Sequence, residues 1–252
     1  MSARSAKPSI AELREVTQPP SIFARNSGEH WAGRLYIRRF SPYVTRRLIP
    51  TPISPNGVTW IMIAVGVAAA GLLAVDSVLA AIGAFLLIQV QILLDCSDGE
   101  LARWRRQFSP VGIYLDRFGH YLTETLFPIA LGIRCDEPVL GLVAAVLALG
   151  VRAESALVAV ARLETGRTKA EDTAAAAAPQ VSLLARLRRA AGFFPLFRAF
   201  IAMELTLLAL VAAIVDEAGE EGTRILVIAL VPIAAITAVG HLAAIVTSER
   251  LK

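Results

Sequence analysis

The chain has 252 residues, of which 56% are hydrophobic, with a formal net charge of +4 and a mean hydropathy of +0.60. Soluble globular domains are about 45–50% apolar, so this composition excludes an ordinary soluble domain and a disordered chain. Two cysteines argue against a disulfide framework, and the positive charge is typical of the lysine and arginine bias of cytoplasmic loops, so we expect no nucleic-acid partner.

The chain begins with a polar and basic stretch of about 50 residues. Within it, residues 28–48 mix aromatic side chains with arginines, which predicts an amphipathic helix lying in the membrane interface, in contact with membrane lipids. A cytosolic helix packed on the acidic segment described below is the alternative. Pro50, Pro52 and Pro55 interrupt the chain before the first apolar run. We therefore expect residues 1–50 to form a cytoplasmic arm and residues 51–252 to form one membrane domain.

Six apolar segments follow, each near the ~20 residues that a helix needs to cross a bilayer. They lie at about 57–75, 77–95, 111–133, 138–161, 193–215 and 224–246. The sequence therefore predicts an all-α integral membrane protein with six transmembrane helices. The helical pattern of the second segment continues to about Gln107, so this helix should project beyond the lipid as a cytosolic extension.

The connecting segments differ in charge. Residues 1–56 carry nine Lys/Arg against three Asp/Glu, and residues 162–198 carry seven against three. The opposite loops are acidic, at Asp136 and Glu137 and again within residues 216–221. Because cytoplasmic loops carry the excess of Lys and Arg, we expect a multi-pass protein of the inner (plasma) membrane with both termini, and the acidic segment, on the cytoplasmic side.

Acidic and very small residues gather between residues 95 and 120. They occupy two helical faces at i, i+3, i+4, i+7 and at i, i+4, i+8: Asp95, Asp98, Gly99 and Ala102 on the first, and Gly112, Asp116 and His120 on the second. Antiparallel neighbours joined by a short loop would bring these faces together. Carboxylates that close cannot all ionise without a cation between them, and oxygen ligands suit Mg²⁺ or Mn²⁺.

Gly99, Ala102 and Gly112 present almost no side chain on the two faces. Such residues often serve close helix packing in membranes, but beside the acids we favour a slot for a flat or bulky ligand. Arg103 is placed to pair with a phosphate through its planar guanidinium. Metal ligands, arginine and slot together predict a site for a pyrophosphate-linked nucleotide.

The pattern Asp-x-x-Asp-Gly-x-x-Ala-Arg-(x)8-Gly-x-x-x-Asp resembles the signature of the CDP-alcohol phosphotransferases, integral membrane enzymes of phospholipid synthesis. The spacing is intact at all seven matching positions, namely Asp95, Asp98, Gly99, Ala102, Arg103, Gly112 and Asp116. Residues 51–59 also resemble the segment that precedes the first span in this family, and the six-span layout extends the resemblance over residues 50–246.

The resemblance implies an enzyme that transfers a substituted phosphate from a CDP-linked donor to an alcohol acceptor with release of CMP. We expect CDP-diacylglycerol as the donor, with a soluble CDP-polyol as the alternative, and a homodimer. The resemblance implies two divalent ions, Mg²⁺ or Mn²⁺, held by Asp95, Asp98 and Asp116. It also implies a CDP pocket shaped by Gly99, Ala102, Arg103 and Gly112.

The last position departs from the family pattern, which ends in a further Asp where this chain has His120. The family's residue is the expected base that deprotonates the acceptor, and it can also contact the second metal. Histidine is a competent base near neutral pH and a competent ligand for Mn²⁺. Three interpretations stay open: His120 is the base and a metal ligand, the base is displaced to Glu124, or the protein is a catalytically weakened binder of CDP and metal.

The later spans carry ionisable residues for which two interpretations compete. Mutual pairing within the helix bundle is one. The other is that Arg152, Lys169 and Arg198 bind an anionic acceptor, such as inositol phosphate or glycerol phosphate.

Overall fold

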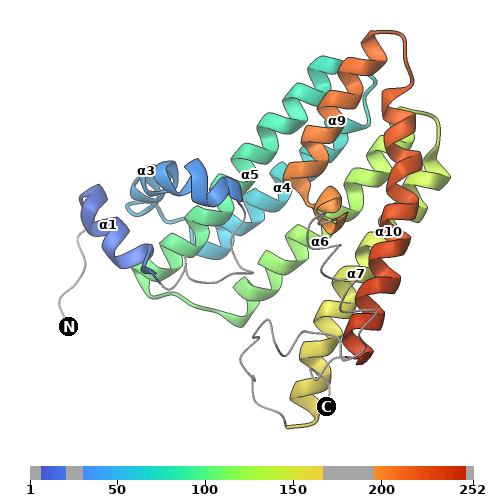
Figure 1. Ribbon diagram of the computed structural model, residues 1–252. Helices are drawn as coiled ribbons and strands as arrows, with labels where there is room; N and C mark the ends of the chain where they lie inside the picture. Colours follow the sequence, from blue (N-terminus) through green and yellow to red (C-terminus); the bar gives the residue numbers. More distant parts are fainter. Residues whose placement is uncertain (1–6, 21–30, 167–195, 248–252) are drawn as a thin grey trace. The chain divides into compact units, whose positions relative to one another are not determined.

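The computed structural model describes residues 7–20, 31–166 and 196–247, and all regular structure within these ranges is helical (Figure 1). The chain divides into two compact units. The first comprises residues 1–69 and 83–123, and the second comprises residues 70–82 and 124–252.

The N-terminal arm of the first unit contains three short helical elements. These are α1 (Ile10–Thr17), the π-helical turn η1 (Gly33–Ile37) and α3 (Arg38–Leu48). A helix begins after Ser9 because the Ser9 Oγ accepts a hydrogen bond from the backbone N–H of Glu12 at 3.1 Å, which satisfies one of the first unpaired N–H groups. The sequence did not predict α1, which packs against α3 (Figure 1).

The helix predicted over residues 28–48 corresponds to η1 and α3 in its described part. One face of α3 contacts α5 (Val78–Arg105) through the hydroxyls of Ser41 and Thr45. Elsewhere the arm exposes Leu35, Phe40 and Tyr43, each more than half accessible to solvent. The arm therefore packs on the helix that carries the acidic motif, while its place in the membrane interface stays a prediction.

Six longer helices correspond to the six predicted apolar segments. They are α4 (Pro55–Leu73), α5, α6 (Pro110–Arg134), α7 (Pro138–Glu164), α9 (Ala202–Glu217) and α10 (Gly222–Thr247), with a 3₁₀ turn η2 (Leu196–Phe200) before α9. Proline starts α4, α6 and α7, where its missing N–H costs no helical hydrogen bond. The extension of α5 beyond the apolar segment ends at Arg105, two residues before the predicted end.

Four of the described helices, α4, α5, α7 and α10, are long and apolar enough to cross a membrane. α6 interrupts its apolar residues with Asp116, Arg117, His120 and Glu124. α9 has 16 residues, fewer than the ~20 that span the hydrocarbon core. The protein is therefore an all-helical membrane protein in its described part, and the count of six spans stays a prediction.

The first unit joins α4, α5 and α6 by apolar and polar packing. Met62, Ile63 and Leu115 form a buried cluster between α4 and α6. Deeper along the helices, Gln91 Nε2 donates a hydrogen bond to Thr123 Oγ1 at 3.0 Å. These contacts hold the acidic faces of α5 and α6 in register with each other.

Arg105 fixes the loop that leads into α4. Its guanidinium donates to four backbone carbonyls at 2.6–3.1 Å, those of Leu48, Ile49, Thr51 and Ile53. A loop has few regular hydrogen-bond partners for its carbonyls, so one guanidinium at the end of α5 replaces them. The first turn of α4 is held in place as a result.

The second unit packs α10 against α7 and α9 (Figure 1). Among the described residues of this unit, the most buried cation is Arg134, which donates to the carbonyls of Val75 and Ser77 at 2.6 and 3.1 Å. The same guanidinium lies 3.2 Å from a carboxylate oxygen of Asp76 and 3.7 Å from one of Asp216. Arg134 therefore joins three segments of this unit at the ends of their helices.

Candidate active site

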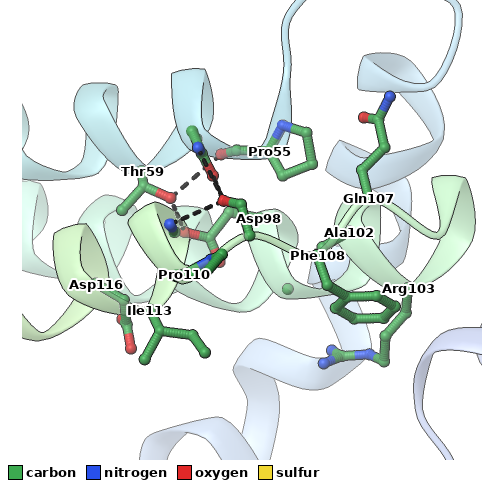
Figure 2. A pocket seen from close by; sticks show the side chains of 14 residues that line it. Pro55, Thr59, Asp98, Ala102, Arg103, Gln107, Phe108, Pro110, Ile113 and Asp116 are labelled. Carbon is green, nitrogen blue, oxygen red and sulfur yellow. Dashed lines mark hydrogen bonds between the residues drawn. The ribbon is translucent and has the colours of Figure 1, made fainter.

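The first unit contains a cavity of about 400 Å³ at the ends of α4, α5 and α6 (Figure 2). This volume lies within the ~300–1,000 Å³ of small-molecule sites. Six of the residues predicted from the acidic motif line it: Asp98, Gly99, Ala102, Arg103, Gly112 and Asp116. The two predicted helical faces therefore do meet, and they enclose a space.

Asp95, Asp116 and His120 form a group that could hold a metal ion. One ligand atom of each lies within 4.8 Å of the others. The Nε2 atom of His120 lies 3.3 Å from Oδ1 of Asp95 and 3.4 Å from Oδ1 of Asp116. Two carboxylate oxygens with one imidazole nitrogen form a donor set that fits Mn²⁺, and the carboxylates also fit Mg²⁺.

Asp98 lies apart from this group, on the wall of the cavity. Figure 2 shows it beside Thr59, whose hydroxyl donates to Asp98 Oδ2 at 2.6 Å. Asp116 belongs both to the three-residue group and to the cavity lining. The candidate metal centre and the cavity therefore adjoin at Asp116.

The glycines of the motif allow close approach on two sides of the cavity. A Cβ added to Gly112 would lie 2.8 Å from Oδ1 of Asn56, so this glycine permits α6 to approach the start of α4. A Cβ added to Gly99 would lie 3.2 Å from Nη1 of Arg103, so the guanidinium lies across α5 at Gly99. Gly112 thus serves helix packing at the edge of the cavity, whereas Gly99 makes room for the arginine.

Arg103 lines the cavity and also contacts the N-terminal arm. Its Nε donates to the backbone carbonyl of Thr17 at 2.6 Å. Thr17 is fully buried at the end of α1. One edge of the guanidinium is therefore held by the arm, while its two Nη atoms lie at Gly99.

The sequence assigned no role to Asn56 and Thr59, although both line the cavity. Asn56 Nδ2 donates to Ser109 Oγ at 3.2 Å, which links the start of α4 to the loop before α6. The two residues are spaced i, i+3 and so share a helical face. That spacing, within the segment that resembles the family's first span, is the signal that could have identified them.

The candidate acceptor residues lie in the second unit or outside the described residues. Arg152 binds both carboxylate oxygens of Glu124, so the pairing interpretation holds for it. Arg198 is exposed in η2, and Lys169 lies outside the described residues. Neither Arg152 nor Arg198 belongs to the cavity lining.

Two groups outside the predicted spans have shifted pKa values. Burial raises the pKa of the Tyr36 hydroxyl, which stays protonated and donates to Oε1 of Gln89 on α5. Burial also raises the pKa of the Cys135 thiol in the turn after α6, so this cysteine is a poor nucleophile.

Comparison with protein families places the chain in a known family. The family model described as CDP-alcohol phosphatidyltransferase matches residues 52–231, which is more than half of the chain. The matched range contains the whole cavity lining and the three-residue group. No curated protein matches the chain.

Proposed function

We propose a function from one premise: the chain belongs to the CDP-alcohol phosphatidyltransferase family. It is therefore a membrane phosphotransferase of the CDP-alcohol type. We propose that it moves a substituted phosphate from a CDP-linked donor, CDP-diacylglycerol, to an alcohol acceptor and releases CMP. The observation that carries this proposal is a cavity lined by the motif residues that adjoins a carboxylate–imidazole group at Asp116.

The donor is proposed to bind along α5. Ala102 presents only a methyl group on the cavity wall, so a flat cytosine ring can lie there beside the Arg103 guanidinium at Gly99. Arg103, at the same wall, would pair with the donor pyrophosphate, because a guanidinium matches two phosphate oxygens at once.

Asp95, Asp98 and Asp116 are proposed to hold divalent ions, Mg²⁺ or Mn²⁺. The hydrogen bond from Thr59 to Asp98 fixes the orientation of one of these carboxylates before any ligand binds. When bound, such ions would polarise the phosphate and neutralise the charge that develops on its oxygens.

His120 is proposed to act as the base. Its Nε2 would accept the proton of the acceptor hydroxyl, and the carboxylates of Asp95 and Asp116 would stabilise the imidazolium that forms. Glu124 suits this role less well, because both of its oxygens are engaged by Arg152.

We propose a phosphorylated polyol as the acceptor and the cytoplasmic membrane face as the location of the site. Arg198 supports an anionic acceptor because its side chain is exposed, whereas Arg152 is engaged by Glu124. Lys169 stays a candidate by its position in the sequence. A homodimer follows from family resemblance, and light scattering of the purified protein would test it.

Turnover with defined substrates tests the proposal. The purified protein, in lipid nanodiscs with Mg²⁺ or Mn²⁺, is incubated with CDP-diacylglycerol or a soluble CDP-polyol and a panel of alcohols and polyol phosphates. Mass spectrometry should detect a phospholipid product and equimolar CMP. Product from the soluble donor alone would replace the lipid donor in this proposal.

A second candidate function has one observation in its favour. The Nε2 atom of His120 lies within reach of the carboxylates of Asp95 and Asp116, and a protonated imidazole in this position would supply an internal cation in place of a metal. The protein would then bind CDP compounds without turning them over. Measurable CMP binding together with no CMP release from any donor, in Mg²⁺ and in Mn²⁺, would favour this binding protein over the enzyme.

A further inference from the structure

Glu100 lies within the donor motif on α5 but does not belong to the cavity lining. Its side chain is fully buried. A buried carboxylate is costly unless hydrogen-bond donors surround it. Here Oε1 accepts from Ser41 Oγ at 2.5 Å and from Gln18 Nε2 at 2.8 Å, and Oε2 accepts from Thr45 Oγ1 at 2.7 Å.

The donors to Glu100 all come from the N-terminal arm. Gln18 is the residue that follows α1, and Ser41 and Thr45 are one turn apart on α3. The guanidinium of Arg38 adds a positive charge at 3.6 Å. One carboxylate of the catalytic helix therefore binds both helices of the arm.

The hydrogen bond from Gln18 to Glu100 also holds the preceding residue, Thr17, in place. Thr17 presents its backbone carbonyl to Nε of Arg103 at 2.6 Å, and Arg103 lines the cavity (Figure 2). A guanidinium is planar, so fixing Nε fixes the plane of the whole group. The two Nη atoms then lie at Gly99 on the cavity wall.

We propose that Glu100 is a positioning residue and that the N-terminal arm is part of the donor site. Glu100 holds Gln18, which places the Thr17 carbonyl, which in turn orients Arg103 toward the donor phosphates. This inference rests on the proposed function, since it assumes a CDP-linked ligand in the cavity. It extends that function by making donor affinity depend on a segment outside the residues matched by the family model.

A double-mutant cycle between Glu100 and Arg103 tests the inference, with CMP and cytidine as probes. Orientation of a phosphate-binding group improves affinity by reducing the freedom lost on binding, so Glu100→Ala should weaken CMP binding about tenfold. Cytidine lacks the phosphate and should bind within about twofold of wild type. If Glu100 acts through Arg103, the double variant should bind CMP no more weakly than Arg103→Ala alone.

Two further variants show whether a loss of CMP binding results from a folding defect. Gln18→Ala removes one donor but leaves the two hydroxyls on Glu100, and it should weaken CMP binding about threefold while α3 stays attached. Arg39→Ala is the matched control, because this side chain is exposed on the same arm; CMP binding should not change. The KM for the donor should follow the CMP affinities in each variant, with kcat reduced by less.

The outcomes separate the two proposals. Additive losses in the cycle, or equal losses of CMP and cytidine affinity, would overturn the positioning role of Glu100. Absence of both CMP binding and CMP release in the wild-type protein would overturn the proposed function instead.

Discussion

The two units of the protein differ in how their ionisable side chains are arranged. In the second unit, three ionisable groups on the described helices are paired with groups of opposite sign: Arg134 with Asp216, Arg152 with Glu124 and His241 with Glu154. In the first unit, carboxylates gather with one another around a single histidine. Charges in membrane-spanning helices are costly in free energy, so in each unit they must be paired with other groups or serve a function.

The difference shows where a ligand is needed. Acids and bases that neutralise one another need no further ion, so we expect the paired helices of the second unit to serve mainly as a scaffold. Carboxylates that share a small volume require a cation or a proton from outside the set. The contrast therefore predicts that the metal ions and the CDP-linked donor bind in the first unit, and the following substitutions test this prediction in order of decreasing expected effect.

Asp116→Asn should abolish turnover, since Asp116 is common to the metal group and the cavity. A loss of about 5 kcal/mol in transition-state stabilisation corresponds to a roughly 5,000-fold drop in CMP release. Glu137→Gln in the second unit, which loses an exposed pair with Arg224, is the control and should stay within about twofold. Activity above one tenth of wild type in Asp116→Asn would remove this residue from the metal centre.

His120→Ala should lower turnover about 10³-fold while donor affinity changes by less than about threefold, because a base acts on the acceptor rather than on CDP. His120→Asp restores the residue type of the family pattern and should recover part of this loss. Stopped assays of CMP release, with parallel CMP titrations, measure both effects. Unchanged turnover in His120→Ala would show that another group accepts the proton.

Arg134→Ala should reduce stability rather than activity, because it leaves Asp76, Asp216 and two carbonyls without their shared donor. Because the carboxylate of Asp76 is 77% exposed and stays hydrated, the loss should be about 2 kcal/mol in the free energy of unfolding, below that of a fully buried pair. Denaturant titration in micelles measures this, and turnover per folded molecule should stay within about twofold. A selective loss of turnover would contradict the scaffold role of the second unit.

Two threonine variants give the finest comparison. Thr59→Val and Thr223→Val each remove a hydroxyl that donates to a carboxylate, Asp98 in the first unit and Asp216 in the second. Loss of a hydrogen bond to a charged group costs about 1.5 kcal/mol, so Thr59→Val should slow turnover about tenfold. Thr223→Val should lower stability by a similar amount and leave kcat unchanged. Equal effects of both variants on kcat would contradict the proposed difference in function between the two units.

Periodicity was sufficient to predict the longer helices and the meeting of two acidic faces. The motif on α5 and the i, i+4 spacing of Asp116 and His120 on α6 repeat with the period of a helix, so the sequence itself contains this information. The catalytic and metal-binding roles of these residues stay predictions.

The contacts that the sequence did not reveal join residues far apart in the chain. Glu100 occupies an unassigned position inside the motif, and its partners Gln18, Ser41 and Thr45 have no helical spacing that points to it. The pairing of Arg152 with Glu124 likewise depends on which faces of α6 and α7 meet. Such contacts are determined by tertiary packing, and the local periodicity of the sequence does not predict them.

The hydrogen bonds that Arg105 donates to the segment before α4 have a consequence for how the protein is made. Arg105 follows its carbonyl partner on Ile53 by 52 positions. At about 5–20 residues per second, a ribosome adds this stretch in roughly 3–10 s, and during that time the start of α4 has no anchor. The wall of the cavity is therefore completed only after α5 has been synthesised, so α4 and α5 must stay together during insertion for the cavity to form.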